Sequence, residues 1–136
     1  MRGVAGALLG VENEVNLLDM DASIEHLGRG TPGEVDELLV VVEPYYRALE
    51  TAGRIAPLAR ELGIRRILAV ANKIRDDEDA RVIREYLSVH GIELVAEIPF
   101  DDAVRDADRR GQSLIDVAPE SDSVRAMRTL AMRLAA

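Results

Sequence analysis

A carboxylate directly follows a short apolar run near the start of the chain. The run is Val15–Leu18, and Asp19 is the residue after it. A short apolar run that ends in an acidic residue and a polar, glycine-containing segment is typical of the end of a buried parallel strand. Open α/β sheets bind their ligands at the carboxyl ends of such strands. Asp19 is therefore the first candidate for a functional site.

Other polar residues that could bind a metal or carry out catalysis lack the partners that this chemistry requires. Asp76–Asp79 places four acids at the start of a predicted helix, where they interact favourably with its dipole, so we interpret them as a helix start rather than a metal site. His26 has no cysteine or second histidine nearby, which leaves too few ligands for a closed metal centre. No nucleophile is paired with a base. We therefore predict no metal ligand and no catalytic residue.

The elements that must position these residues form an α/β pattern. Four apolar runs are predicted to be strands, and they are Val15–Leu18, Glu37–Val42, Arg66–Ala71 and Leu94–Ile98. Gly63 and Gly91 each precede an isoleucine, the pattern of a left-handed helix cap followed by an apolar contact. This repeat of helix, glycine and strand predicts right-handed crossovers. We therefore expect a parallel sheet of about four strands with helices on both faces.

The predicted helices carry apolar side chains at the spacing that forms one buried face. The first helix runs from about Tyr46 to Leu62. The last begins at Ser121 or Ser123, either of which can cap a helix. Its inward side chains are expected to be Val124, Met127, Ala131 and Leu134. Arg133 is expected to point outward.

Composition restricts the class of protein. The chain has 136 residues, of which 48% are hydrophobic, so residues 1–136 are expected to bury one core and to form one domain. Its 25 acidic and 17 basic residues give a net charge of −8, which repels nucleic acid and anionic membranes, so we expect neither as a partner. The absence of cysteine is compatible with a cytoplasmic protein. The first apolar residues are expected to form a soluble helix because they are too few to span a bilayer.

The segment after the first predicted strand resembles a known family. Asp19–Thr31 reads D-M-D-A-S-I-E-H-L-G-R-G-T. It is similar to the Walker B and switch II region of the deviant-Walker-A ATPases of the MinD/ParA group, and most similar to the CooC-type maturation factors of nickel carbon monoxide dehydrogenase. Asp21 stands where that family usually has glutamate, and Ser23 where it has glycine. The resemblance implies that Asp19 holds magnesium through water. It also implies that the γ-phosphate of ATP faces Asp21, Ala22 and Ser23.

Two further segments resemble the adenine site of the same family. Asn72 and Lys73 follow a predicted strand, as the base-reading residues of this nucleotide-binding class do. A carboxamide presents a donor and an acceptor side by side, which suits adenine, whereas guanine-specific relatives carry an aspartate where this chain has Arg75. Ile98–Gly111 resembles the segment whose proline and following backbone wrap the adenine ring. The resemblance implies that adenine is held by Asn72, Lys73, Pro99, Phe100 and Asp101. The alternative for Asn72 and Lys73 is a turn without a ligand.

The resemblance covers the later part of the family's P-loop NTPase fold. The sequence contains no P-loop of the pattern G-K-G-G-x-G-K-T and no C-x-C pair. Residues 1–136 are therefore expected to be the carboxyl-terminal portion of a deviant-Walker-A ATPase domain. ATP and magnesium are the implied cofactors of the complete protein. The implied partners are an adenine nucleotide, a second copy of the chain, the amino-terminal half and a nickel enzyme.

Two alternative functions stay open at this point. One is a positioning ATPase of the MinD/ParA type, against which the residues Glu25–Leu27 and the following G-R-G-T argue. The other is a truncated, non-enzymatic remnant or interaction module. Under each of these hypotheses, the CooC-type one included, we expect that this chain alone does not hydrolyse ATP.

Overall fold

A parallel three-stranded sheet forms the centre of the described structure. The computed structural model describes residues 15–17, 19 and 35–136. The elements in these residues are β1 (Glu37–Val42), α3 (Tyr46–Glu61), β2 (Arg66–Ile74), α4 (Asp77–Val89), β3 (Glu93–Pro99), α5 (Asp102–Arg109), α6 (Leu114–Val117) and α7 (Asp122–Leu134). The strands lie in the order β1, β2, β3, and all pairs are parallel.

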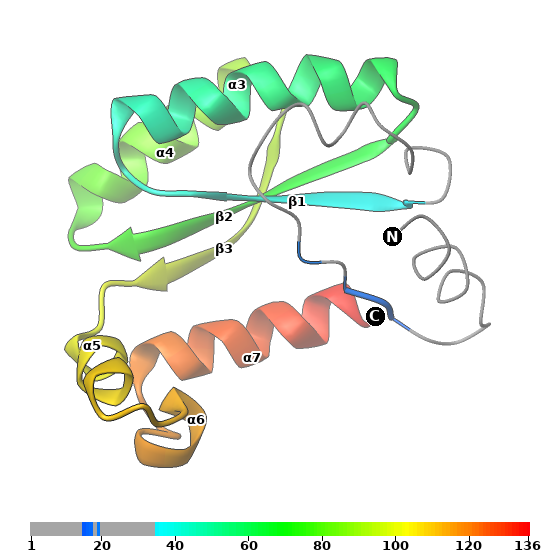
Figure 1. Cartoon of the computed structure of the whole chain (residues 1–136). Coiled ribbons are helices and arrows are strands. Elements are labelled where there is room, and N and C mark those ends of the chain that lie inside the picture. Colours follow the sequence, from blue (N-terminus) through cyan, green and yellow to red (C-terminus); the bar gives the residue numbers. More distant parts are fainter. Residues whose placement is uncertain (1–14, 18, 20–34) are drawn as a thin grey trace.

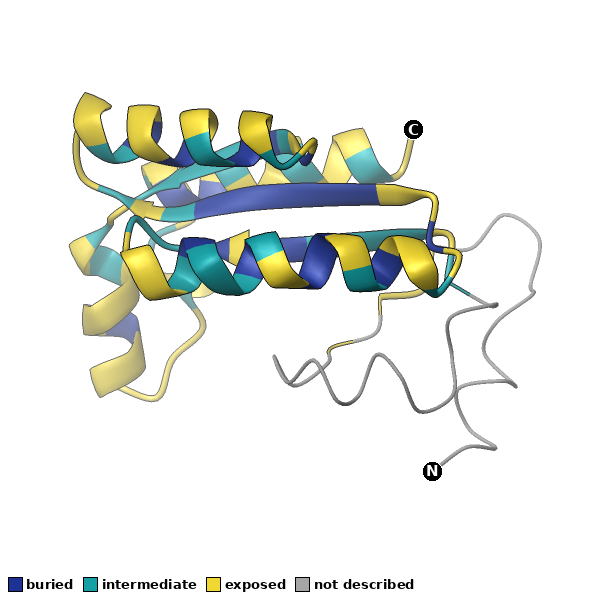
Figure 2. Ribbon diagram, turned by 90° about the horizontal axis from the view of Figure 1, so that it is seen from above, coloured by how far each residue is buried: buried dark blue, intermediate teal, exposed yellow. Residues whose placement is uncertain are grey.

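Helices cover both faces of this sheet (Figure 1). On one face, α3 and α4 pack against the strands in a core that includes Val42, Leu49 and Ile83. On the other face, α7 packs against a smaller cluster that includes Leu68 and Val70. Figure 2 shows that the buried residues gather on the strands and on the helix faces that meet them. The predicted α/β class with helices on both faces is confirmed.

Two glycines end the helices that precede β2 and β3. Gly63 and Gly91 have φ angles of +87° and +64°, in the left-handed region that glycine adopts without strain. The N–H of Ile64 donates to the Ala59 carbonyl at 3.0 Å, and the equivalent bond follows Gly91. Both isoleucines are buried, so each cap leads the chain directly into the next strand. The predicted caps are confirmed.

The predicted strand Val15–Leu18 is not part of the described sheet. Val15 and Leu17 are 68% and 83% exposed, and residues 15–17 have no regular secondary structure. A strand forms only where a neighbouring strand pairs with its backbone N–H and C=O groups. In the described part of the chain, β1, β2 and β3 pair only with one another. The expected number of about four strands is therefore corrected to three in the described residues.

The apolar face of α7 differs from the predicted one. Val124 is buried and Leu134 packs against the sheet, as expected. Met127 and Ala131, which were expected to face inward, are exposed, and Leu130 packs against the sheet instead. Because α7 lies mainly along the single strand β3, its buried stripe is narrower than the spacing of its apolar residues suggests.

Arg133 of α7 also differs from the expectation that it points outward. Its guanidinium donates to the Val95 carbonyl at 3.0 Å and to the Glu93 carboxylate at 2.8 Å. The register between β2 and β3 skips Val95, so this residue lies at an irregularity in the ladder. Arg133 therefore supplies a hydrogen-bond donor to the strand at a point where the regular pairing is interrupted.

Asp101 joins the end of β3 to two helices. It is the N-cap of α5, and its Oδ1 accepts a hydrogen bond from the Ala103 N–H at 2.9 Å. Its Oδ2 accepts one from the hydroxyl of Ser123 at 2.7 Å. Ser123 is 1% exposed and lies in the first turn of α7, which Ser121 caps. The hydroxyl of Ser123, followed by the Ala103 N–H, holds the pKa of Asp101 below its usual range.

β1 is an edge strand of the described sheet. It pairs with β2, and no other described strand pairs with it. Val40 and Val42 are buried beneath α3, whereas Val41 between them faces the opposite side and is 59% exposed. An apolar side chain on an edge strand favours association with another chain.

We predict that Asp101→Asn makes the stability of the protein less sensitive to acid. The pKa of Asp101 is lower in the folded chain than its unfolded value of about 3.9, so this group stabilises the fold above that value. That contribution is lost as the pH falls through the folded-state pKa. Urea unfolding, measured from pH about 6 down to about 2, gives the free energy of unfolding at each pH. This free energy should fall less for Asp101→Asn than for the wild type. Asp108→Asn, which removes an exposed charge from the same helix, is the control, and identical profiles for Asp101→Asn and the wild type would contradict the assignment.

We also predict that the chain self-associates at high concentration and that Val41→Lys weakens this association. A lysine on an edge strand introduces a charge where a second apolar surface would pack. Sedimentation velocity over a concentration series measures the effect. The matched control is Val89→Lys, which places the same charge at a valine that is 83% exposed on α4. If the wild type, Val41→Lys and Val89→Lys associate equally, β1 is not the surface through which the chains associate.

Candidate functional site

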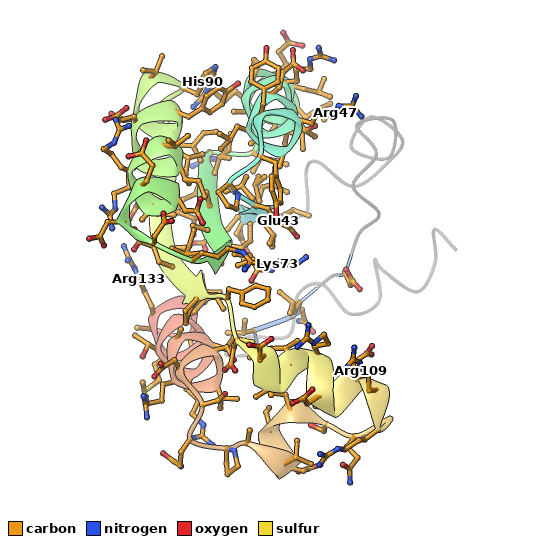
Figure 3. All side chains as sticks on the ribbon, turned by 90° about the vertical axis from the view of Figure 1, so that its left-hand side faces the viewer. Glu43, Arg47, Lys73, His90, Arg109 and Arg133 are labelled. Carbon is orange, nitrogen blue, oxygen red and sulfur yellow. The ribbon has the colours of Figure 1, made fainter. Side chains whose placement is uncertain are left out.

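The carboxyl ends of the three strands meet at one edge of the sheet, as parallel pairing requires. Glu43 directly follows β1, and Lys73 lies near the end of β2. The Lys73 Nζ lies 2.6 Å from a carboxylate oxygen of Glu43. Figure 3 shows the two side chains pointing toward one another. This ion pair, which the sequence did not suggest, joins the ends of two neighbouring strands.

A bulge in β2 shapes the backbone at this edge. Ala71 pairs with Glu97 and Ile74 pairs with Pro99, so β2 has one more residue than β3 between these two pairs. Lys73 lies within the bulge and has a φ of +60°, the only positive φ of a residue other than glycine in the described chain. Positive φ is unfavourable for a residue with a Cβ and is concentrated at functional sites.

The bulge fixes the side chain of Asn72. Its Oδ1 accepts a hydrogen bond from the Lys73 N–H at 3.0 Å, and the residue is half-buried. A carboxamide has two acceptor lone pairs and two N–H groups, so one such bond leaves it able to bind the edge of a base. The bond thus orients Asn72 at the carboxyl end of β2 without using its full hydrogen-bonding capacity.

The end of β3 lies beside this bulge. The Phe100 N–H donates to the Ile74 carbonyl at 2.8 Å, which extends the β2–β3 pairing by one residue. The guanidinium of Arg75 lies over the Phe100 ring, with its Cζ 3.7 Å from the ring centroid. The structure therefore brings together four of the five residues that the sequence predicted for adenine, namely Asn72, Lys73, Pro99 and Phe100.

Asp101, the fifth predicted residue, lies next to them but has structural partners. Its two carboxylate oxygens accept hydrogen bonds from Ala103 and from the buried Ser123. These contacts fix the direction in which the chain leaves β3. Asp101 thus positions the Pro99–Phe100 segment. Ser123 was not predicted as part of the site, because no local pattern relates it to a residue 22 positions earlier.

The residues predicted to face magnesium and phosphate are described only in part. Asp19 is described and is exposed. Asp21, Ala22 and Ser23 lie outside the described residues, and so does His26. Their predicted roles stay predictions.

The acidic run at the start of α4 has the predicted capping role. Oδ1 of Asp76 accepts a hydrogen bond from the Asp79 N–H at 2.9 Å, which caps the helix. Oδ2 of Asp79 accepts one from the Arg75 N–H at 3.0 Å. Among the described residues, no three histidine, cysteine or acidic side chains are grouped as metal ligands. No helix in the same part of the chain has the length and apolar character needed to cross a membrane.

Comparison with known sequences identifies relatives of this chain. The chain is 43% identical over 112 residues to the carbon monoxide dehydrogenase accessory protein CooC of Rhodospirillum rubrum, an alignment that covers 82% of this chain and 42% of that protein. It is 40% identical over 93 residues to an ATP-binding protein of Methanocaldococcus jannaschii, covering 68% of this chain and 36% of the relative. No protein-family model matches the chain.

Solved structures with the same fold lead to the same superfamily. A ParA family ATPase from Chlorobium tepidum matches with a TM-score of 0.65 and 30% identity, over 82% of this chain and 46% of that one. The MinD cell division protein of Aquifex aeolicus matches with the same TM-score at 21% identity, over 76% of this chain and 45% of that one, which supports the fold alone. The chain spans less than half the length of each of these relatives. By sequence and by fold, this chain is a CooC-type member of the MinD/ParA superfamily.

Proposed function

We propose that the chain provides the base-binding part of an ATP site in a CooC-type ATP-binding protein. The observation that carries this proposal is the β2 bulge, which sets Asn72 and Lys73 beside Pro99 and Phe100 at the carboxyl edge of the sheet. Ligands of open parallel sheets bind at this edge. The relatives named as ATP-binding proteins support the choice of an adenine nucleotide.

The residues at this edge fit an adenine base. A base needs an apolar surface against its flat face and a polar group that reads its edge. Pro99 and Phe100 offer the apolar surface, and the amide of Asn72 offers a donor and an acceptor. Asp101 would hold the wrapping segment in place through its bonds to α5 and α7.

The phosphate and magnesium part of the site is proposed from the sequence. Asp19 would hold magnesium through water, and Asp21, Ala22 and Ser23 would face the γ-phosphate. A MinD structure from Pyrococcus horikoshii contains Mg-ADP, and it shares the fold of this chain with a TM-score of 0.59. Magnesium would neutralise phosphate charge in the complete protein.

The biological role that we propose is nickel insertion during the maturation of carbon monoxide dehydrogenase, in the cytoplasm. It rests on the 43% identity to CooC, which is named as an accessory protein of that enzyme. The client would be a nickel enzyme. An amino-terminal half would complete the ATP site, and the assembly would be a homodimer.

A positioning ATPase of the MinD type is the second candidate. Its support is weaker, because the MinD-type proteins of Guillardia theta and Mesostigma viride are 28% and 29% identical to this chain. A non-enzymatic remnant is the third, and it is the outcome if no adenine compound binds.

We predict that adenosine binds more tightly than guanosine and that Asn72→Ala weakens adenosine binding. Loss of a bidentate contact between an amide and a base costs ~1–3 kcal/mol, the magnitude found in DNA readout, which is about fivefold or more in affinity. Saturation-transfer NMR of the nucleoside detects such weak binding. The control is Gln112→Ala, which removes an exposed carboxamide from the loop after α5. Guanosine binding as tight as that of adenosine would overturn the prediction.

We further predict that a polypeptide of these 136 residues does not hydrolyse ATP at a measurable rate. Its sequence has no P-loop, whose backbone N–H groups and lysine stabilise the transferred phosphoryl group. A phosphate-release assay with magnesium tests this. Phosphate release that is lost in an Asp19→Ala variant would show that the chain is an ATPase by itself.

A further inference from the structure

The Phe100 ring is covered on one face by the guanidinium of Arg75. The Arg75 Cζ lies 3.7 Å from the ring centroid, which is a close cation–π contact. The backbone of each residue is held by its own hydrogen bond, from the Arg75 N–H to Asp79 and from the Phe100 N–H to the Ile74 carbonyl. The side-chain contact therefore links the residue after β2 to the residue after β3, across the proposed base site.

This contact is open to solvent on its outer side. Phe100 is 36% exposed, and Arg75 is exposed. Because the Arg75 backbone is fixed independently of its guanidinium, the side chain can leave the ring without a change in the fold. A cation–π contact at an exposed site is weaker than the stacking of a nucleobase on an aromatic ring. A base that reaches this ring can therefore replace the guanidinium.

We propose that Arg75 is a displaceable cover of the Phe100 ring, whose place is taken by the adenine base when it binds. This proposal rests on the proposed function and adds a regulatory feature to it. The free protein has its stacking surface occupied by its own side chain. Each binding event must break the cation–π contact, so Arg75 lowers the affinity for the base while shielding an exposed aromatic ring from water.

The proposal predicts that Arg75→Ala binds adenosine about two- to fivefold more tightly than the wild type, because the competing contact is gone. Adenosine is the appropriate probe because it is neutral, so the lost positive charge does not itself change its attraction to the protein. Arg65→Ala is the matched control. This substitution removes an exposed arginine that directly precedes β2, whereas Arg75 directly follows it. The Arg65→Ala protein should bind adenosine with the affinity of the wild type.

NMR tests the contact and its displacement separately. Phe100 is the only phenylalanine in the chain, so its ring signals are assigned without ambiguity. In the free protein, these signals should shift in Arg75→Ala and stay unchanged in Arg65→Ala. On titration with adenosine, the wild-type ring signals should move as the guanidinium is replaced. Ring signals that are identical in Arg75→Ala and the wild type would overturn the proposal.

A double-mutant cycle of Arg75→Ala and Phe100→Leu tests whether the base and Arg75 compete for the Phe100 ring. In a Phe100→Leu background, Arg75→Ala should no longer tighten adenosine binding, as measured on the signals of the nucleoside. If the wild type binds adenosine and Arg75→Ala binds it equally or more weakly, the cover is refuted and the proposed function stands. If neither protein binds adenosine at millimolar concentration, both are refuted.

Discussion

The parallel pairing of β2 with a strand on each side is the constraint on which the rest of the structure depends. β2 is buried on both faces between Ile67 and Ala71, with exposed fractions of 7% or less. Burial on both faces leaves its backbone groups no partner except the neighbouring strands, so the ladders must form. Because all the pairs are parallel, three carboxyl ends are placed at one edge. The position of the candidate site is a direct consequence.

If the regular pairing of β2 with β3 continued after Ala71, Asn72 would lie opposite Ile98 in an ordinary strand geometry. The extra residue in β2 interrupts that geometry, and the left-handed conformation of Lys73 absorbs it. Two contacts hold Lys73 in this conformation. Its side chain forms an ion pair with Glu43, and its backbone N–H donates a hydrogen bond to Oδ1 of Asn72. Exposed ion pairs contribute little to stability, so we attribute the main role of the Glu43 contact to orientation. The bulge therefore gives the carboxyl edge of the sheet its local shape at the proposed base site.

The second support of the site comes from the far end of the chain. Asp101 connects the segment after β3 to α5 and, through Ser123, to α7. α7 in turn packs against β3, where Arg133 donates to the carbonyl of Val95. The Pro99–Phe100 segment is thus held by the strand before it and by two helices after it. This arrangement explains how the last residue of β3 and the residue after it keep a defined position beside the end of β2.

The sequence by itself determined the local elements and the family. Apolar runs predicted four strands, of which three are present in the described residues. The glycine caps at Gly63 and Gly91 follow from backbone sterics that act over a few residues. The residues that we propose for the adenine site could also be selected from the sequence, because they lie in segments that resemble the family pattern. Only the tertiary structure decided what depends on distant partners. Val15–Leu18 has strand-like residues, yet a strand requires a neighbour that the run does not encode. Asp101 meets Ser123 only when α7 has packed against β3, and Arg75 meets Phe100 only when β2 has paired with β3.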